Sequence, residues 1–229
     1  MDALLENFFN LQVYYQVLPY LLHGLWTTVW LSIMVIPLGL LAGLALAIVA
    51  TRSRQRWPRI LVAIHVDFFR AFPPLVLLIF IYFAMPFFGW DIPKLAAVAL
   101  GFTLNTSAYY AEVFRAGLGS VPKGQDEAAR STGLSAWQAL CYVTIPQATR
   151  KVLPDLLGNS IEVVKMTTLA SVVAMPELLK AARDAQSMIY NPSPVVLAAL
   201  MYLALLWPLV RLLSHIERRH VGQVRNKLG

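Results

Sequence analysis

The chain has 229 residues, of which 58% are hydrophobic and only 14% carry a charge, whereas soluble domains carry about 25% charged residues. This composition excludes a soluble globular domain, and several apolar runs of roughly 20 residues predict helices that cross a membrane. A β-barrel is disfavoured because these runs are continuously apolar instead of alternating. The net charge of +7 does not indicate nucleic acid binding, because the basic residues flank the apolar runs. We therefore expect an all-α membrane protein.

The first 20 residues combine several aromatic side chains with two acidic ones and end next to Pro19. This pattern predicts an N-terminal helix over 1–20 that lies in the membrane interface and is anchored by its aromatic rings. An ordered tail without that role is the alternative. Asp2 and Glu6 stand where a cleavable signal sequence has basic residues, so we expect no signal peptide.

Five apolar segments form the predicted transmembrane domain, 21–214. They cover about 21–50, 60–86, 94–116, 152–174 and 194–213. Gly39 and Gly43 in the first segment favour close helix packing, and Pro37 is expected to kink that segment. A basic tail, 215–229, follows the fifth segment.

The positions of the basic residues predict the orientation of the chain. The segment Thr51–Arg59 holds four arginines, and no lysine or arginine precedes it. In the five-span arrangement, 14 of the 19 lysines and arginines lie in segments on one side, 3 lie on the other side and 2 lie within spans. Because cytoplasmic segments are rich in basic residues, we expect an external N-terminus and a cytoplasmic C-terminus.

The longest polar interruption is the loop 117–150, between the third and fourth spans. Asp126–Arg130 is a good helix former, Gly133 permits a sharp turn, and Leu134–Val143 has apolar residues at helical spacing. The loop is therefore predicted to form two short helices with a glycine corner at the membrane surface. Another protein could bind such a rigid pair of helices. A plain amphipathic linker is the alternative that the pattern alone leaves open.

Several motifs in the chain are similar to one family. Glu127-Ala128-Ala129, followed by Gly133 and by Val143–Pro146, resembles the EAA loop of permease subunits of ATP-binding-cassette importers. Phe69–Leu75 is similar to an Arg-Gly-Thr-Pro-Leu stretch of that family, but Ala71-Phe72 replaces the small Gly-Thr before the proline and makes the local packing bulkier. Other stretches resemble the polar-amino-acid branch, which includes histidine, glutamine, arginine and octopine permeases: Ala108–Arg115, Val121–Gln125, Ile145–Ala148 and Lys165–Leu169. Within the last stretch, Met166 replaces a residue that is commonly acidic or small and polar.

The resemblance implies a type I importer permease with five transmembrane helices, a periplasmic N-terminus and a coupling helix in the 117–150 loop. The residues expected to contact the ATPase are Lys123, Gly124, Glu127, Ala128, Ala129 and Gly133. The implied partners are two ATPase subunits, a second permease subunit that is identical or homologous, and a periplasmic amino-acid-binding protein. In a bacterial inner membrane, this assembly would import a polar amino acid or derivative by alternating access. ATP and Mg would be bound by the ATPase, so no cofactor is expected in this chain.

Polar residues within membrane spans are costly and are usually functional. The candidate substrate-pathway residues are Arg70, Asn105, Tyr109, Glu162, Lys165 and Thr168. Arg70 and Lys165 are expected to bind the carboxylate of an amino acid. Glu162, helped by Asn105 and Tyr109, is expected to bind its ammonium group or a cationic side chain. The alternative is that Arg70 and Lys165 hold the bundle together. Glu112 and Arg115 are predicted to form an ion pair that supports the loop.

Other functions fit the sequence less well. The four histidines are scattered without metal-binding spacing, and neither a Gly-x-Ser-x-Gly elbow nor a phosphate-binding Gly-x4-Gly-Lys-Ser/Thr loop is present. We therefore expect neither an enzyme nor a metal site. A secondary transporter would normally show internal repeats, and a non-transporting membrane scaffold is the remaining alternative. Glu162 favours a basic or opine-type solute.

Overall fold

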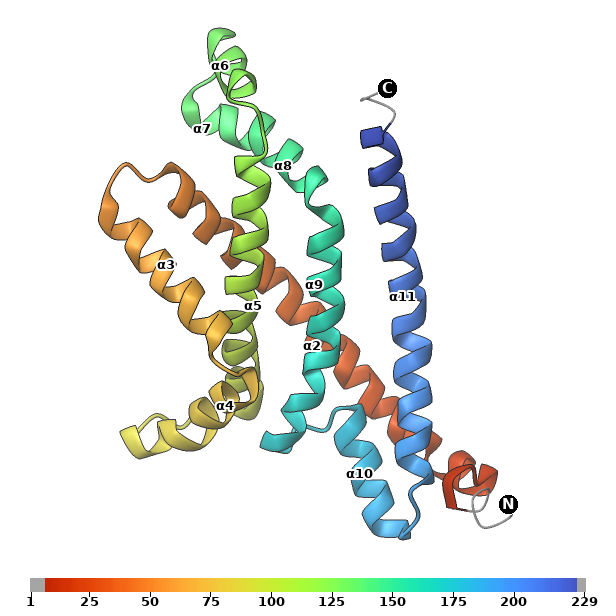
Figure 1. The fold of residues 1–229 in the computed structure, drawn as a ribbon. Helices are drawn as coiled ribbons and strands as arrows, with labels where there is room; N and C mark the ends of the chain where they lie inside the picture. Colours follow the sequence, from red (N-terminus) through yellow and green to blue (C-terminus); the bar gives the residue numbers. More distant parts are fainter. Residues whose placement is uncertain (1–6, 226–229) are drawn as a thin grey trace. The chain divides into compact units, whose positions relative to one another are not determined.

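The computed structural model describes residues 7–225, and every regular element in that range is helical (Figure 1). Residues 1–6 of the predicted interfacial helix and 226–229 of the predicted basic tail lie outside the described residues. The chain divides into two compact units, to both of which α2, α5 and α9 contribute. The first unit contains the chain up to Val35, Leu75–Gly101 and the chain from Ile161; the second contains Ile36–Pro74 and Phe102–Ser160.

The first long helix, α2, runs from Leu11 to Arg52 and has 42 residues. It passes through Pro19, where the sequence predicts the end of an interfacial helix, and through Pro37. A proline inside a helix removes one backbone donor. In the first unit, Val17 and Leu21 lie one turn apart across Pro19, and both are buried in the same apolar cluster. The packing of this face favours a continuous helix over a break at the proline.

The range predicted as a single second span, 60–86, is interrupted. α3 (Arg56–Ala71) ends at Phe72, whose ψ of 126° is extended, and α4 (Pro74–Ile79) begins after Pro73. A proline disfavours the helical conformation in the residue before it. Pro73 therefore explains why an apolar run of the right length does not form one helix.

The remaining elements are also helical. α6, α7 and α8 occupy the predicted loop 117–150, and α10 lies in the segment predicted to be external. The bounds are Phe80–Ala84 (π-helical), Met85–Phe88 (3-10), α5 Lys94–Gly119, α6 Lys123–Ser131, α7 Ala136–Ala139, Leu140–Thr144 (π-helical), α8 Ile145–Lys151, α9 Leu153–Met166, Thr167–Val173 (3-10), α10 Leu178–Ile189 and α11 Ser193–Arg225.

Three helical stretches among the described residues are long and apolar enough to cross a membrane: Leu11–Arg52, Leu153–Val173 and Ser193–Arg218. A fourth is added if the interrupted pair α3 and α4 counts as one span. α5 has 26 residues, but polar and charged side chains, including Asn105 and Glu112, make it less apolar. The chain is thus a multi-pass membrane protein, while the count of five spans and the orientation of the termini stay predictions.

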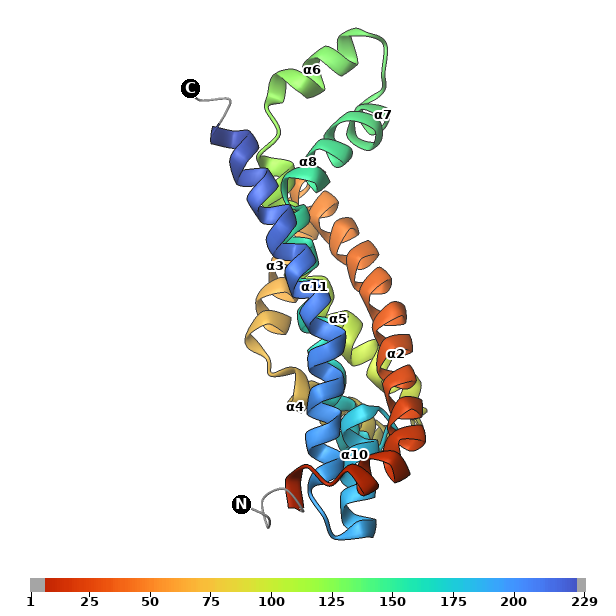
Figure 2. The same cartoon turned by 90° about the vertical axis from the view of Figure 1, so that its right-hand side faces the viewer.

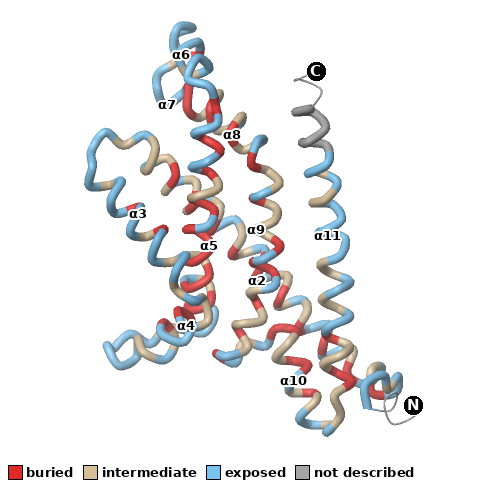
Figure 3. Tube along the Cα trace, in the orientation of Figure 1, coloured by how far each residue is buried: buried red, intermediate tan, exposed pale blue. Residues whose placement is uncertain are grey.

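In the second unit, α2 packs very closely against α5 through two glycines. A Cβ atom at Gly43 would lie 2.5 Å from Cβ of Tyr110 and 2.9 Å from the backbone nitrogen of Ala111. A Cβ atom at Gly39 would collide with the hydroxyl of Thr106. Tyr110 is completely buried, and buried residues recur along α5 (Figure 3). The close packing that the sequence predicts for Gly39 and Gly43 is confirmed.

In the first unit, Glu177 and the residue that follows it join three helices. Glu177 is 0% exposed, and its oxygens accept hydrogen bonds from the N–H groups of Leu179 and Lys180 at the start of α10, each at 2.8 Å. Tyr202 of α11 donates its hydroxyl to the same carboxylate at 2.8 Å. Thr28 of α2 accepts a hydrogen bond from the backbone N–H that follows Glu177, at 3.2 Å. Burial raises the pKa of Glu177, and the backbone donors oppose this shift.

Replacement of Gly43 by alanine tests the contact between α2 and α5. The added methyl group would meet backbone and Cβ atoms that cannot rotate away, and overpacking of this kind costs about 1–3 kcal/mol. We expect Gly43→Ala to lower the unfolding temperature of the purified protein in detergent. Gly119→Ala is the matched control, because no atom lies within 4 Å of a Cβ atom built there. Equal stability of the two variants would contradict the tight contact.

Candidate functional site

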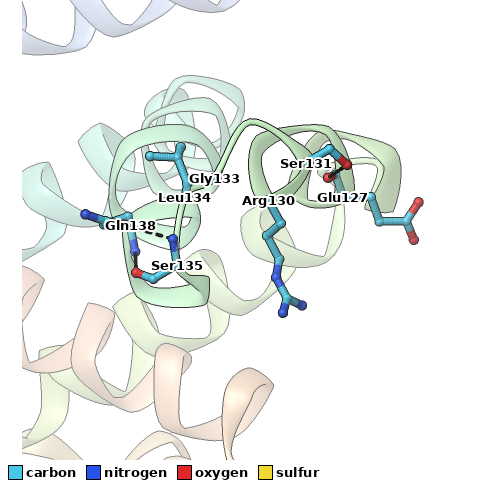
Figure 4. Close-up of a pocket in the computed structure, with 7 residues that line it drawn as sticks. All are labelled: Glu127, Arg130, Ser131, Gly133, Leu134, Ser135 and Gln138. Atoms are coloured by element: carbon cyan, nitrogen blue, oxygen red, sulfur yellow. Dashed lines mark hydrogen bonds between the residues drawn. The ribbon is translucent and has the colours of Figure 1, made fainter.

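The loop 117–150 folds, as predicted, into short helices with a corner at Gly133. α6 and α7 lie beyond the C-terminal end of α5 in both views (Figures 1 and 2). Gly133 has a φ of +95°, which residues with a Cβ atom rarely adopt. α7 then begins with a capping box: the hydroxyl of Ser135 accepts the N–H of Gln138 at 3.3 Å, and the side chain of Gln138 accepts the N–H of Ser135 at 2.8 Å (Figure 4). The corner is thereby fixed on the side of α7.

α6 has two faces with different surroundings. One face contacts the rest of the second unit: Ala129 is buried, Asp126 pairs with Arg52, and Gln125 accepts a hydrogen bond from Gln147 of α8 at 3.1 Å. The other face is exposed and consists, at helical spacing, of Gly124, Glu127, Ala128 and Ser131. A helix that is packed along one face and exposed along the other presents a well-ordered surface to a partner.

An open hollow of about 580 Å³ lies beside this exposed face (Figure 4). Its wall carries one acidic side chain, one basic side chain, hydroxyls and an amide. The lining residues are Glu127, Arg130, Ser131, Gly133, Leu134, Ser135 and Gln138. Small-molecule sites are mostly apolar and enclose their ligand, whereas this hollow is open and polar. Its character fits the side chains of another protein.

Two predicted pathway residues on α5 have structural partners at the end of α3. Helical carbonyls normally accept the N–H four residues later, so the carbonyls of Phe69 and Arg70 would require donors from Pro73 and Pro74, which have none. The side-chain nitrogen of Asn105 donates to the carbonyl of Phe69 at 2.9 Å. The hydroxyl of Tyr109 donates to the carbonyl of Arg70 at 3.5 Å. Both side chains thus replace the missing donors of the interrupted helix.

The side chain of Arg70 belongs to the same group in the second unit. Its guanidinium carbon lies 5.9 Å from the centre of the Tyr109 ring, within the range of a cation–π interaction. The residue is exposed, and no carboxylate among the described residues forms an ion pair with it. An anionic group of a ligand or a partner could therefore reach it.

The other predicted pathway residues form a group of their own in the first unit. Lys165 and Glu162 form an ion pair on α9, with Nζ and Oε1 2.6 Å apart and side chains 49% and 66% exposed. The hydroxyl of Thr168 is bound to the backbone carbonyl of Lys165 at 2.8 Å. The α-helical hydrogen-bonding pattern ends at Met166, where a 3-10 stretch begins. The ion pair thus lies, open to contact, where the helix changes its geometry.

Local ion-pair spacing was predictive, but one long-range pair was missed. Arg115 and Glu112 form the predicted ion pair through two hydrogen bonds, so that prediction is confirmed. From the sequence, Arg52 is predicted only to be one of four arginines that orient the chain. Its contact with Asp126, 74 residues away, has no signature in local spacing. The one available signal was that Asp126 directly precedes the Glu127-Ala128-Ala129 motif.

Comparison with known families and proteins gives consistent matches. A family model described as binding-protein-dependent transport system inner membrane component matches residues 35–221. The chain is 36% identical over 180 residues to the probable amino-acid ABC transporter permease protein YckA of Bacillus subtilis, with 78% of each chain covered. It is 33% identical over 221 residues to the histidine/lysine/arginine/ornithine transport system permease protein HisM of Salmonella typhimurium, covering 91% of this chain and 93% of HisM.

Solved structures show the same likeness. A crystal structure of an amino acid ABC transporter with histidines contains a chain that is 33% identical, with a TM-score of 0.80; the match covers 90% of this chain and 96% of that one. A chain of the MetNI methionine ABC transporter, in an inward-facing conformation, matches with a TM-score of 0.71 at 22% identity, over 88% of this chain and 96% of that one. The second likeness supports the fold.

Replacement of Asn105 tests its role at the end of α3. Asn105→Leu keeps the size of the side chain but removes the donor, and an unsatisfied buried carbonyl costs about 1–3 kcal/mol. We expect this variant to unfold at a clearly lower temperature in detergent. Tyr109→Phe should cost less, because its hydrogen bond is longer and the side chain is 39% exposed. If Asn105→Leu were as stable as the parent protein, the assigned role would be wrong.

Proposed function

The chain belongs to the family of binding-protein-dependent transport system inner membrane components, and we propose that it is the transmembrane subunit of an ATP-driven importer for a polar amino acid or a derivative. Its amino-acid permease relatives and its fold support this function. The observation that carries the proposal is the exposed face of α6 beside the polar hollow.

In the proposed assembly, α6 is the coupling helix. Lys123, Gly124, Glu127 and Ala128 contact an ATPase subunit, and Gly133 sets the corner that lets α7 turn away. Ala129, buried in this chain, supports the helix from behind. ATP and Mg are bound and ATP is hydrolysed in the ATPase, so this chain carries no cofactor of its own and performs no catalysis.

The complete importer contains two such ATPases, a second permease subunit that is identical or homologous, and a periplasmic amino-acid-binding protein. It lies in a bacterial inner membrane with five spans per permease and the N-terminus in the periplasm. A solute released by the binding protein passes through the permease pair by alternating access. Each permease subunit responds to its ATPase through α6.

The two polar groups are the proposed contacts of the solute. Arg70, which forms no ion pair with a carboxylate among the described residues, attracts the carboxylate of an amino acid, and Asn105 and Tyr109 hold the end of α3 that carries Arg70. On α9, Lys165 and Glu162 offer one charge of each sign. A zwitterion can exchange with such a pair, because the pair is exposed and weakly held.

The solute is proposed to be basic or opine-like. Glu162 is more exposed than its partner Lys165 and can receive a cationic side chain without losing its place on α9. The name of HisM, a relative that matches over most of its length, includes histidine, lysine, arginine and ornithine. Thr168, whose hydroxyl donates to the backbone carbonyl of Lys165, is assigned to the wall of the pathway.

The coupling role of the corner is tested with two glycines of similar backbone conformation. Gly133 and Gly89 have φ angles of +95° and +82°, and a Cβ atom at either would meet no neighbour within 4 Å. Alanine therefore causes comparable backbone strain, of about 1–2 kcal/mol, at both positions. We expect Gly133→Ala to reduce uptake and binding-protein-stimulated ATPase activity in proteoliposomes, and Gly89→Ala to leave both nearly unchanged. Equal effects would contradict a special role for the corner.

The solute preference is tested with two ion pairs of the same spacing. Glu162→Gln should reduce uptake of labelled arginine more than uptake of labelled glutamine, because it removes the negative charge that receives a cationic side chain. Glu112→Gln breaks the other pair of this spacing, Glu112–Arg115, and should not change the ratio of the two uptake rates. Unchanged arginine uptake by Glu162→Gln would refute the role of Glu162.

A further inference from the structure

We propose that Arg52, the last residue of α2, is the positioning residue that links the coupling helix to the transmembrane part of the second unit. The proposal rests on the docking function of α6 and adds how a displacement of α6 reaches the helices. The role of Arg52 is to transmit movement of α6 to α2. The stability of the fold depends little on it.

A single nitrogen of Arg52 contacts two parts of the loop. Its Nη2 atom lies 3.3 Å from Oδ1 of Asp126 on α6 and 3.5 Å from Oγ1 of Thr144. Thr144 ends the π-helical segment Leu140–Thr144 and is buried. The arginine thus reaches both the coupling helix and the π-helical segment through which the chain returns to the membrane. Such π-helical segments occur frequently at functional sites.

The position of Asp126 gives the link its direction. Asp126 lies on the face of α6 opposite Gly124, Glu127, Ala128 and Ser131, so a partner can occupy the exposed face without displacing Arg52. The helix has only nine residues, and a helix this short moves as one body. A force on the exposed face of α6 therefore also moves its inner face. On that inner face, Arg52 of α2 forms a hydrogen bond with α6.

From Arg52 the contacts continue through the second unit without a flexible joint. Arg52 ends α2, and the preceding part of α2 touches α5 at Gly39 and Gly43 with no room for even one added methyl group. α5 in turn holds the end of α3 through Asn105 and Tyr109, next to Arg70. A contiguous set of contacts thus joins the coupling helix to a proposed solute contact.

The strength of the ion pair fits a transmitting role. The side chains of Arg52 and Asp126 are 39% and 24% exposed, and partly exposed pairs contribute little to stability. Arginine suits the position because its planar group can bind two acceptors at once, and a cation is favoured at the C-terminal end of a helix. Arg54, two residues later, is exposed and makes no hydrogen bond or ion pair with the loop among the described residues.

The test compares uptake with ATP hydrolysis in the complete transporter, purified with its ATPase and binding protein and reconstituted in proteoliposomes. Labelled histidine, arginine and glutamine serve as probes. The variants are Arg52→Gln, Asp126→Asn, which keeps the shape of the side chain, and the exchange of Arg52→Asp with Asp126→Arg. Arg54→Gln is the matched control, because it removes the same charge from the same segment without touching the loop.

We expect Arg52→Gln and Asp126→Asn to lower the amount of solute moved per ATP hydrolysed by about fivefold or more, with the ATPase still bound. The exchanged pair should restore most of this ratio, and Arg54→Gln should keep it, since charge alone is not the cause. A normal ratio in Arg52→Gln, or no restoration by the exchanged pair, would overturn the link. A parent complex that hydrolyses ATP but moves none of the three amino acids would instead contradict the proposed function.

Discussion

The hydrogen bond from Asn105 to the carbonyl of Phe69 meets the most demanding physical condition on this chain. In lipid, a backbone polar group must find its partner inside the protein. The two prolines that follow α3 leave two carbonyls without donors, and the chain supplies the donors from α5. The polar residues of α5 therefore compensate for the donors that are lost where the helix is interrupted. This arrangement also places Arg70 beside Tyr109, where its charge remains available.

Close contact and weak contact have different tasks in the second unit. Gly39 and Gly43 bring α2 and α5 so near each other that they cannot slide without collision, and interiors of this density transmit strain. Arg52 and Asp126 are joined only by a partly exposed ion pair. In the proposed link, a stiff pair of helices attached to α6 by a reversible polar contact can move in steps and return, as a transport cycle requires.

The sequence predicted the features that depend on local spacing. The two helices around Gly133, the ion pair of Glu112 with Arg115 and the close packing at Gly39 and Gly43 all follow from residues within a few positions of one another. The continuation of α2 past Pro19 could not be predicted, because burial of its apolar face outweighs the local effect of the proline.

Partners that are distant in the sequence could not be predicted, because local spacing carries no information about them. The donor for Phe69 lies 36 residues along the chain, and the partner of Arg52 lies 74 residues away. Composition and periodicity identify Asn105 as polar within an apolar run, but they do not say which atom it satisfies. The break in the second span was signalled by Pro73-Pro74, yet the length of the apolar run favoured one continuous helix.

The separation of the two faces of α6 has a consequence for how such a subunit evolves. In the proposed assembly, substitutions on the exposed face alter recognition of the ATPase, while the buried side preserves attachment to the permease itself. In that assembly, each side can change without affecting the other, so related permeases can keep the same internal contacts while they bind different ATPases. Within the nine residues of α6, the choice of partner and the transmission of movement would then depend on different side chains.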